Sequence, residues 1–282
     1  MTTLDQIQQP HSLAGSSEAT AIEQAARVAE VFAAVRVAQD CPRDTTAAIR
    51  EMETACAQPA LANRAFFSLP RAGGRVEGST VHLARELARC WGNLDYGIRE
   101  LRRDDEAGVS EMQAWAWDQQ SNVRSSRSFV VPHAIMAGRG AEKRRKALTD
   151  LGDIANNNNS VAARAVRETI FTVLPVWFRE QAEEIASRTL RGEGTGETLD
   201  QRKAKAIAHY EHAWNVTREQ LEARLGRPSS QWTAQDIGFL QVLTSEMQRG
   251  EKHPDSEFPA DEAPGISAAE LPSARAAEGP GQ

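Results

Sequence analysis

Apolar residues recur at helical spacing along most of the chain. In residues 20–39 they form one stripe, which consists of Ile22, Ala25, Ala29, Phe32 and Val35. Asp44 has the position of an N-cap, so a second helix is expected from there to about Ala57. A third helix starts near Val81 and is expected to end at Gly92, because glycine readily adopts the left-handed backbone of a helix stop.

Alternation with a period of two occurs in residues 94–132. Three segments alternate, LDYGIREL, SEMQAWAW and VRSSRSFVV, and the short turns DDEAG and QQSN separate them. Short turns between consecutive strands favour an antiparallel sheet, and the flanking helices must cover its faces. The pattern therefore predicts an α+β fold. It is a three-stranded antiparallel β-meander packed against helices, with a small C-terminal helical module and disordered termini.

The periodicity of apolar residues is weak immediately after the meander. Residues 133–150 contain glycines and a basic cluster without a strong apolar period, and we expect a mobile loop there. A helix is expected from about Ser160, and Pro175 should kink or break it. The expected core contacts of this helical region are Val161, Ala165, Phe171, Leu174 and Phe178.

The C-terminal part has clear helix boundaries. One helix is expected near residues 200–213, and Thr217 with Gln220 forms the capping box of the next, which closes at Gly226. The last helix starts at Thr233, and its inward residues are Ile237, Leu240 and Leu243. The expected organisation is a disordered N-terminus at 1–19, a core at 20–195, the helical module at 196–250 and an acidic disordered tail at 251–282.

The composition is that of an ordinary globular protein. The 282 residues are 40% hydrophobic and 26% charged, which allows one large domain with a small appendage. The chain contains no run of roughly 18 apolar residues and no N-terminal signal pattern, so we expect neither a membrane span nor export. Its cysteines, Cys41, Cys56 and Cys90, lie far apart and are expected to be reduced and buried in an intracellular protein.

Charge is distributed unevenly along the chain. The net charge is −6, and the residues from His253 onward contribute −5 of it, so the remainder is close to −1. Residues 124–167 contain nine lysines and arginines against three acids. A basic segment in a balanced body indicates a polyanionic partner, with solvated surface charge as the alternative.

No enzyme motif is present. The stretch SLPRAGGRVEGST at residues 68–80 is close to a nucleotide-binding loop, but Ser79 replaces the lysine and Glu77 adds negative charge. The close pair His209 and His212 lacks a third metal ligand and is expected at the surface. We therefore expect no cofactor, no metal and no catalytic centre. The enzymatic alternative is a metal-dependent nuclease, whose carboxylates would be Asp95, Glu111 and Asp118, although no lysine accompanies them.

Basic and neutral polar residues can line a groove for a single strand of nucleic acid, because cations that neutralise phosphates release counterions. The candidates come from the glycine-rich stretch, the third strand, the mobile loop and the long helix: Arg71, Arg75, Arg124, Arg127, Lys143, Arg144, Arg145, Lys146, Asn157, Arg164 and Arg167. Arg164 and Arg167 are three apart and share one helix side. Asn156 to Asn159 offer donors and acceptors beside that side, or form a capping loop. Trp115 and Trp117 either stack on bases or belong to the core.

Three stretches resemble, in this order, blocks of phage single-strand DNA annealing proteins of the Redβ/RecT type. They are FFSLPRAGGRVEGSTVHLARELARCWGNLDYG, SVAARAVRETIFTVLP and VTREQLEARLGRPSSQWTAQDIGFLQVLTSEMQRGE. The first has a Pro-Arg-Gly-rich turn, a helix and Trp-Gly-Asn, and the third is similar to the C-terminal helical segment of RecT-type recombinases. Together they span most of residues 65–250.

The resemblance implies an ATP-independent protein that anneals complementary single-stranded DNA in phage homologous recombination, in the cytoplasm of a bacterial host. It implies a homo-oligomer, as a ring or filament, with an exonuclease and a host single-strand binding protein as further partners. It also places Arg167 at the position of the arginine typical of the helix block.

Two departures from the family pattern stand out. Gly78-Ser79-Thr80 stands where related sequences often have Gly-Pro-Ser, and WDQQSN replaces a more acidic turn, which argues against a carboxylate role there. The alternatives are the metal-dependent phage nuclease and a non-catalytic adaptor or structural protein.

Overall fold

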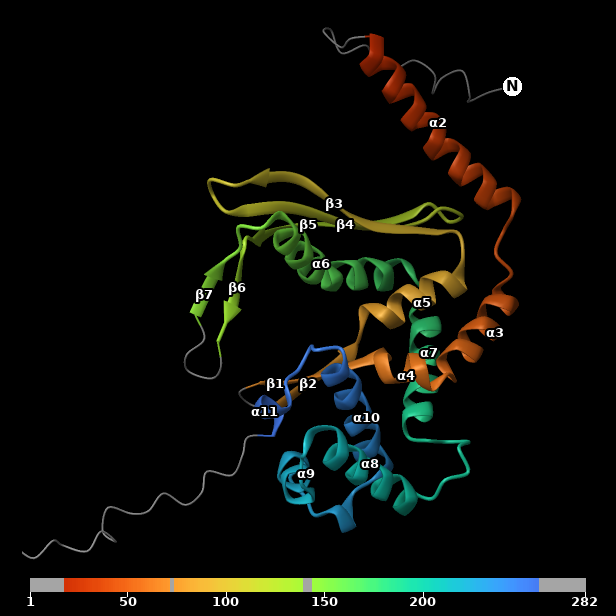
Figure 1. Ribbon diagram of the computed structural model, residues 1–282. Helices are drawn as coiled ribbons and strands as arrows, with labels where there is room; N and C mark the ends of the chain where they lie inside the picture. Colours follow the sequence, from red (N-terminus) through yellow and green to blue (C-terminus); the bar gives the residue numbers. More distant parts are fainter. Residues whose placement is uncertain (1–17, 72–73, 139–143, 259–282) are drawn as a thin grey trace, which may run out of the picture.

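The computed structural model describes residues 18–71, 74–138 and 144–258 (Figure 1). The N-terminal elements are α2 (Glu18–Asp40), α3 (Thr45–Cys56), α4 (Pro59–Ala65), β1 (Phe66–Arg71), β2 (Gly74–Ser79) and α5 (Val81–Trp91). The strands that follow are β3 (Leu94–Asp104), β4 (Val109–Asp118), β5 (Val123–Pro132), β6 (Ala134–Ala137) and β7 (Arg144–Ala147). The remaining elements are α6 (Leu151–Val173), α7 (Val176–Leu190), α8 (Leu199–Trp214), α9 (Arg218–Leu225), η2 (Ser229–Gln231), α10 (Ala234–Gln248) and α11 (Pro254–Glu257).

The predicted fold class is confirmed. The strands β3, β4 and β5 form an antiparallel sheet in that order, and α6 lies across one face of it (Figure 1). Helices α3, α4, α5 and α7 form a further layer beyond α6, and the C-terminal helices lie at the far end from the sheet (Figure 1). The termini that were expected to be disordered lie outside the described residues at 1–17 and 259–282.

The strand register decides which side chains face α6. Ala114 of β4 pairs with Ile98 and Arg127, and Ala116 pairs with Tyr96. Ala114 and Ala116 are fully buried, and their small side chains let α6 come close to the sheet. The alternate residues of β4 point to the other face, which has no helix packed along its length in Figure 1.

The main core lies between the sheet, α3, α5, α6 and α7. Met52, Leu83, Leu87, Ile170 and Phe178 are all fully buried in it. Burying such side chains contributes about 1.5–3 kcal/mol each to folding. The helices of the core are therefore fixed by their apolar sides.

Local signals gave several helix boundaries correctly. The side chain of Asp44 accepts a hydrogen bond from the Ala47 amide at the start of α3. Gly92 follows α5 with a φ of 73°. Pro175 separates α6 from α7 and is the N-cap of α7, because it cannot donate the backbone hydrogen bond that a continuous helix needs.

Two regions expected to be loops contain β-hairpins. The glycine-rich stretch supplies β1 and β2, which pair antiparallel, so Gly74–Ser79 is a strand and not a phosphate-binding loop. Residues 133–150 supply β6 and β7, which also pair antiparallel. All four residues of β7 are exposed. A hairpin that buries neither face needs no apolar alternation, and the sequence pattern could not reveal it.

Helix α6 starts nine residues earlier than expected and buries a different side. Asp150 caps it by accepting hydrogen bonds from the amides of Gly152 and Asp153. The four asparagines are therefore inside the helix, and they do not form a capping loop. The buried side includes Ile154, Ala162, Val166 and Ile170, whereas Val161, an expected core contact, is 44% exposed. The expected contacts Leu174 and Phe178 are buried.

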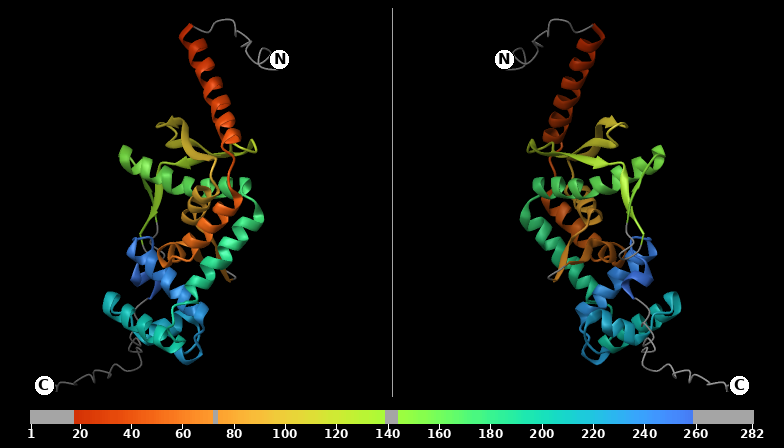
Figure 2. Two further views of the ribbon diagram at one scale, coloured as in Figure 1. Left: turned by 90° about the vertical axis from the view of Figure 1, so that its right-hand side faces the viewer. Right: turned by 90° about the vertical axis from the view of Figure 1, so that its left-hand side faces the viewer.

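The first predicted helix exists, but most of its apolar stripe is exposed within the described part of the chain. Ile22 is 63% exposed and Phe32 is 50% exposed, and Ala38 is the one buried residue of α2. Figure 2 shows the N-terminal end of α2 pointing away from the sheet and the other helices in both views, whereas the middle of α2 lines a hollow together with residues of the sheet.

The C-terminal helices have a second core. It is formed by Tyr210, Leu221, Trp232, Ile237 and Leu243, among others. The predicted capping box of α9 is present, and Gly226 ends that helix in the left-handed conformation. The last predicted helix, α10, begins at its N-cap Thr233.

The acidic tail begins later than predicted. Phe258 is buried in the second core, and Arg224 lies 2.7 Å from the carboxylate of Glu257. Residues 251–258 therefore belong to the helical module, because an aromatic side chain and an ion pair attach them to it.

The cysteine prediction holds for two of the three residues. Cys56 and Cys90 are buried, and burial raises the pKa of Cys56 to about 12 and that of Cys90 to about 11. Cys41 is exposed, contrary to the prediction. It follows the end of α2, where the chain leaves the exposed helix.

A buried ion pair joins the chain before α3 to the end of β4. The Arg43 Nη2 atom lies 2.8 Å from Oδ1 of Asp118, and the two side chains are 11% and 4% exposed. Asp118 also accepts backbone hydrogen bonds from Gln120 and Ser121. Burial alone would raise the pKa of the Asp118 carboxyl, but the hydrogen bonds from Arg43 and Ser121 outweigh burial and hold the pKa below its usual value.

Replacing Asp118 with Asn is expected to lower the free energy of unfolding at neutral pH by about 3 kcal/mol, because it leaves the Arg43 guanidinium buried without its carboxylate. The folded-state pKa is lowered, so the pair stabilises the protein above the unfolded-state pKa near 3.8. That contribution is lost as the pH falls through the folded-state pKa. Urea titrations at several pH values should show the difference between the two proteins shrinking in acid.

Glu51→Gln is the matched control for Asp118→Asn. Glu51 forms an ion pair with Arg89 in which both side chains are more than half exposed, and its loss should cost less than about 1 kcal/mol. A stability difference between wild type and Asp118→Asn that stayed constant down to acid pH would show that the carboxylate charge is not its cause.

Candidate nucleic-acid interface

Arg127 and Arg164 come together at the free edge of the sheet. Arg127 is on β5, which is an edge strand of the sheet among the described residues, and Arg164 is on α6. Both line a hollow of about 640 Å³ whose other lining residues are Ser128, Phe129, Ser160, Val161, Ala165 and Glu168. The acid among them, Glu168, is 2.6 Å from Arg167, so its charge is partly neutralised. The hollow therefore offers two cations to an anion.

Six candidate cations are exposed and have no ion pair within the described residues: Arg124, Arg127, Arg144, Arg145, Lys146 and Arg164. Other arginines of the sheet do have acidic partners, since Arg102 pairs with Asp104 and Arg103 with Asp105. Cations that form no ion pair leave a positive potential that attracts a polyanion.

The hairpin of β6 and β7 carries three of these cations. Arg145 is opposite Met136, while Arg144 and Lys146 point to the other face of the hairpin. Figure 1 shows the hairpin leaving the sheet beside α6. Asn157 connects these elements, because its side-chain amide donates a 2.9 Å hydrogen bond to the carbonyl of Pro132 at the end of β5.

Arg124 and Arg127 lie on opposite faces of β5. Arg124 pairs in register with Trp117, and its guanidinium lies 4.0 Å from the centre of that indole ring. Arg127 pairs with Ala114 on the face that α6 covers. Residues three apart on a strand point in opposite directions, so the two arginines flank the sheet edge from its two sides.

Arg167 has extensive contacts inside the protein. Its Nη1 donates a 3.1 Å hydrogen bond to the carbonyl of Ser79, and its Nη2 donates one of 2.6 Å to Glu168. The guanidinium lies over the Phe67 ring, and the side chain is 17% exposed. Arg167 thus fastens α6 to the end of β2, and its contact with DNA stays a prediction.

The remaining candidates are placed only by their backbone or not at all. Arg71 ends β1 and Arg75 lies in β2, on a hairpin separate from the sheet. Lys143 lies outside the described residues.

The three carboxylates of the nuclease alternative do not converge. Asp118 is buried against Arg43 on the face toward the helices, whereas Asp95 is on the other face and accepts a 2.8 Å hydrogen bond from the Trp115 indole. Glu111 is opposite Arg102, far along the strands from Asp95. Within the described residues, no three or more His, Cys, Asp and Glu side chains are grouped so that they could hold a metal ion.

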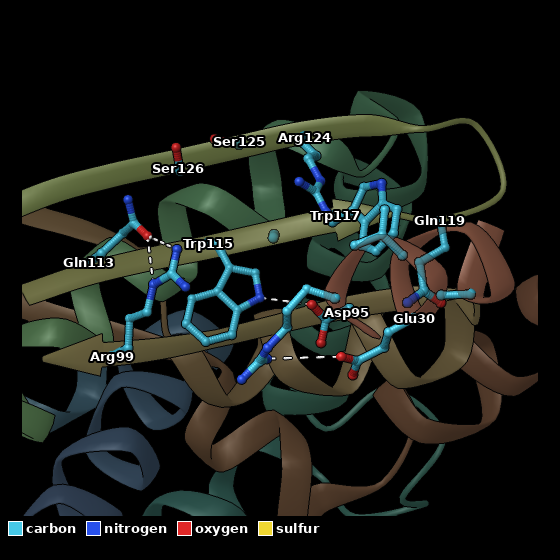
Figure 3. Close-up of a pocket in the computed structure, with 14 residues that line it drawn as sticks. Glu30, Asp95, Arg99, Gln113, Trp115, Trp117, Gln119, Arg124, Ser125 and Ser126 are labelled. Atoms are coloured by element: carbon cyan, nitrogen blue, oxygen red, sulfur yellow. Dashed lines mark hydrogen bonds and ion pairs between the residues drawn. The ribbon is translucent and has the colours of Figure 1, made fainter. Parts of the chain in front are cut away.

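The uncovered face of the sheet holds residues that were not among the candidates. The Arg99 guanidinium donates hydrogen bonds of 2.9 and 2.6 Å to Gln113, and both residues line a hollow with Trp115, Trp117 and Arg124 (Figure 3). Strand alternation is the signal that could have found them, because it puts Gln113 and Trp115 on one face. Neither tryptophan belongs to the core between sheet and helices.

A scan against protein-family models gives no match, and searches of curated proteins and of solved structures give none either. Within the residues that the structure describes, no helix is both long and apolar enough to cross a membrane.

Arg167→Ala is expected to lower the free energy of unfolding by about 1–3 kcal/mol, because it removes the charge-assisted hydrogen bond that joins α6 to β2. Urea denaturation measures the change. Arg164→Ala is the matched control on the same helix, since Arg164 is exposed and should affect stability by less than about 0.5 kcal/mol. Equal stability of the two variants would mean that the contacts of Arg167 do not hold α6 in place.

Proposed function

We propose that this protein binds single-stranded DNA by its phosphates and anneals complementary strands without ATP, in phage homologous recombination. The observation that carries this proposal is the set of six exposed cations without acidic partners in the described residues, on β5, the β6–β7 hairpin and α6. The order of the three sequence stretches that resemble phage annealing proteins supports it independently.

The edge of β5 is the proposed binding path for single-stranded DNA. Arg124 lies on one side of that edge, and Arg127 with Arg164 lies on the other. Contacts to phosphates position a strand without reading its sequence. The base edges then remain available to a second strand, and correct pairing supplies stacking energy that a mismatch does not.

Annealing needs no bond to be made or broken by the protein. The bound strand is preserved, and sequence is read by base pairing in the nucleic acid itself, as in guide-based recognition. The functional requirement is therefore electrostatic. Cations must hold the backbone firmly enough to extend the strand and loosely enough to release the duplex.

Helix α2 supports the proposal that the protein acts as an oligomer. Its side chains Ile22, Val28, Val31, Phe32 and Val37 are between 44% and 63% exposed. A helix whose apolar side chains are largely exposed among the described residues is suited to contact with a second copy. Neighbouring subunits would extend the surface that binds single-stranded DNA.

Replacing both Arg127 and Arg164 with Ala is expected to weaken the binding of a single-stranded oligonucleotide at least tenfold, because each charge-assisted hydrogen bond contributes about 1.5–3 kcal/mol. The slope of log affinity against log salt should become smaller by about 1.4 for the two lost phosphate contacts. Fluorescence anisotropy with a labelled oligonucleotide at several salt concentrations measures both quantities.

Arg50→Ala is the control for charge alone, since Arg50 is exposed on α3, away from β5. Mixing complementary labelled oligonucleotides without ATP tests the annealing itself, and the wild type should speed duplex formation. Cleavage that requires a divalent metal would favour the nuclease, and an absence of single-strand binding at low salt would leave the adaptor.

Phe32→Glu is expected to reduce the mass of the protein in solution toward that of one chain, because it places a charge in the apolar stripe of α2. Multi-angle light scattering measures the mass. Ala34→Glu adds the same charge on the opposite side of the helix, about 160° from Phe32, and should leave the mass unchanged. Equal masses for wild type and Phe32→Glu would exclude this side of α2 as a subunit contact.

A further inference from the structure

The indole of Trp115 lies flat on the backbone of the neighbouring strand. Trp115 pairs with Gly97 of β3, and a Cβ atom at Gly97 would lie only 2.7 Å from Cζ2 and 2.8 Å from Cη2 of the ring. These distances are too short for any side chain, so the ring occupies the place that glycine leaves free. Its Nε1 donates a 2.8 Å hydrogen bond to Asp95, which fixes the ring in this orientation.

A ring held in this way can offer only its other face to a ligand. That face belongs to a hollow of about 610 Å³ between the sheet and α2, where Arg27, Glu30, Val31 and Ala34 form the helical wall (Figure 3). The volume is within the range of small-ligand sites and exceeds what a single nucleobase needs. The hollow is therefore large enough for a planar ring over Trp115.

Polar groups that can bind the edge of a base line the same hollow as the ring. Gln113 accepts both hydrogen bonds from Arg99 on its oxygen, and its amide nitrogen has no hydrogen-bond partner in the described residues. Ser126, on β5, is directly opposite Trp115 and lines the same hollow. An amide and a hydroxyl can pair with the edges of several bases, so the site does not require one particular base.

Trp117 is not equivalent to Trp115. It is 5% exposed, its ring is covered by the Arg124 guanidinium at 4.0 Å, and its Nε1 donates to Asn122. Trp117 therefore positions Arg124. The Arg99 guanidinium also lies over the Trp115 ring, but at 5.5 Å from its centre, and Trp115 is only partly buried. Trp115 is therefore the ring that a stacked base can reach.

The ring is also close to the path of the phosphates. Ser126 is next to Arg127 in sequence, and adjacent strands of a sheet are about 5 Å apart, so Trp115 is one strand from the edge of β5. A nucleotide whose phosphate contacts Arg124 or Arg127 can extend its base across the edge onto the uncovered face.

We propose that Trp115 is a stacking platform for one nucleobase of the bound single strand, with Gln113 and Ser126 at the edge of that base. The platform rests on the proposed function, since the strand that supplies the base is the one held at the edge of β5. It adds a contact with the base itself to the phosphate contacts. The affinity for single-stranded DNA then depends on the presence of bases.

The experiment compares two oligonucleotides of the same length, one of thymidine nucleotides and one with abasic sugars, which have equal phosphate charge. Trp115→Leu is expected to weaken binding of the thymidine oligonucleotide about 5- to 150-fold, the range found for one stacked base. Binding of the abasic oligonucleotide should not change. Trp115→Phe, which keeps an aromatic face, should recover part of the loss.

Gly97→Ala gives a second measurement that leaves the tryptophan in place. The added methyl group would push the indole off the strand, so the same selective loss of the thymidine oligonucleotide is expected. Trp177→Leu removes a half-exposed tryptophan from α7 and serves as the matched control, with binding of both oligonucleotides unchanged.

Three outcomes would overturn the platform. Equal weakening of both oligonucleotides by Trp115→Leu would show that the indole acts through the fold or the phosphates. Unchanged affinity for both in folded Trp115→Leu and Gly97→Ala, or a change in oligomer mass alone, would assign the hollow to another use such as a subunit contact. A wild type that binds neither oligonucleotide would contradict the proposed function as well, whereas in the first two cases the phosphate contacts still stand.

Discussion

The structure depends on the packing of α6 against one face of the sheet. Ala114 and Ala116 are small and fully buried, so the helix lies close to β4 and its apolar side is continuous with the core of α5 and α7. The pairing of the strands then forces the alternate residues of β4 onto the opposite face. A sheet covered in this one-sided way keeps Gln113, Trp115 and Arg124 together on a face where a ligand can reach them.

The same alternation determines how the cations are arranged. Arg124 and Arg127 leave β5 on opposite faces, and Arg164 on α6 approaches only the second of them. A groove formed on one face cannot include all the basic residues. Because the edge of β5 is the line where the two faces meet, it is the position at which a polyanion can contact cations from both sides.

The carboxylates and Arg167 show that tertiary contacts decide whether a charged residue stabilises the fold or is available to a ligand. Asp118 and Arg43 form a buried pair, Asp95 accepts a hydrogen bond from an indole, and Arg167 binds a backbone carbonyl and Glu168. Each charge is used to hold elements together. Exposed cations that form no ion pair within the described residues are the ones left to attract an external anion.

The sequence determined the features that depend on a few neighbouring residues. The N-cap at Asp44, the capping box at Thr217, the break at Pro175 and the alternation of the three strands of the sheet were all predictable, because each acts through backbone hydrogen bonds or side-chain direction over a few residues. The tertiary structure alone decided which apolar side α6 buries, why the stripe of α2 stays exposed, and that Arg167 faces Ser79. That last contact joins residues 88 positions apart, and no local pattern records a partner at such a distance.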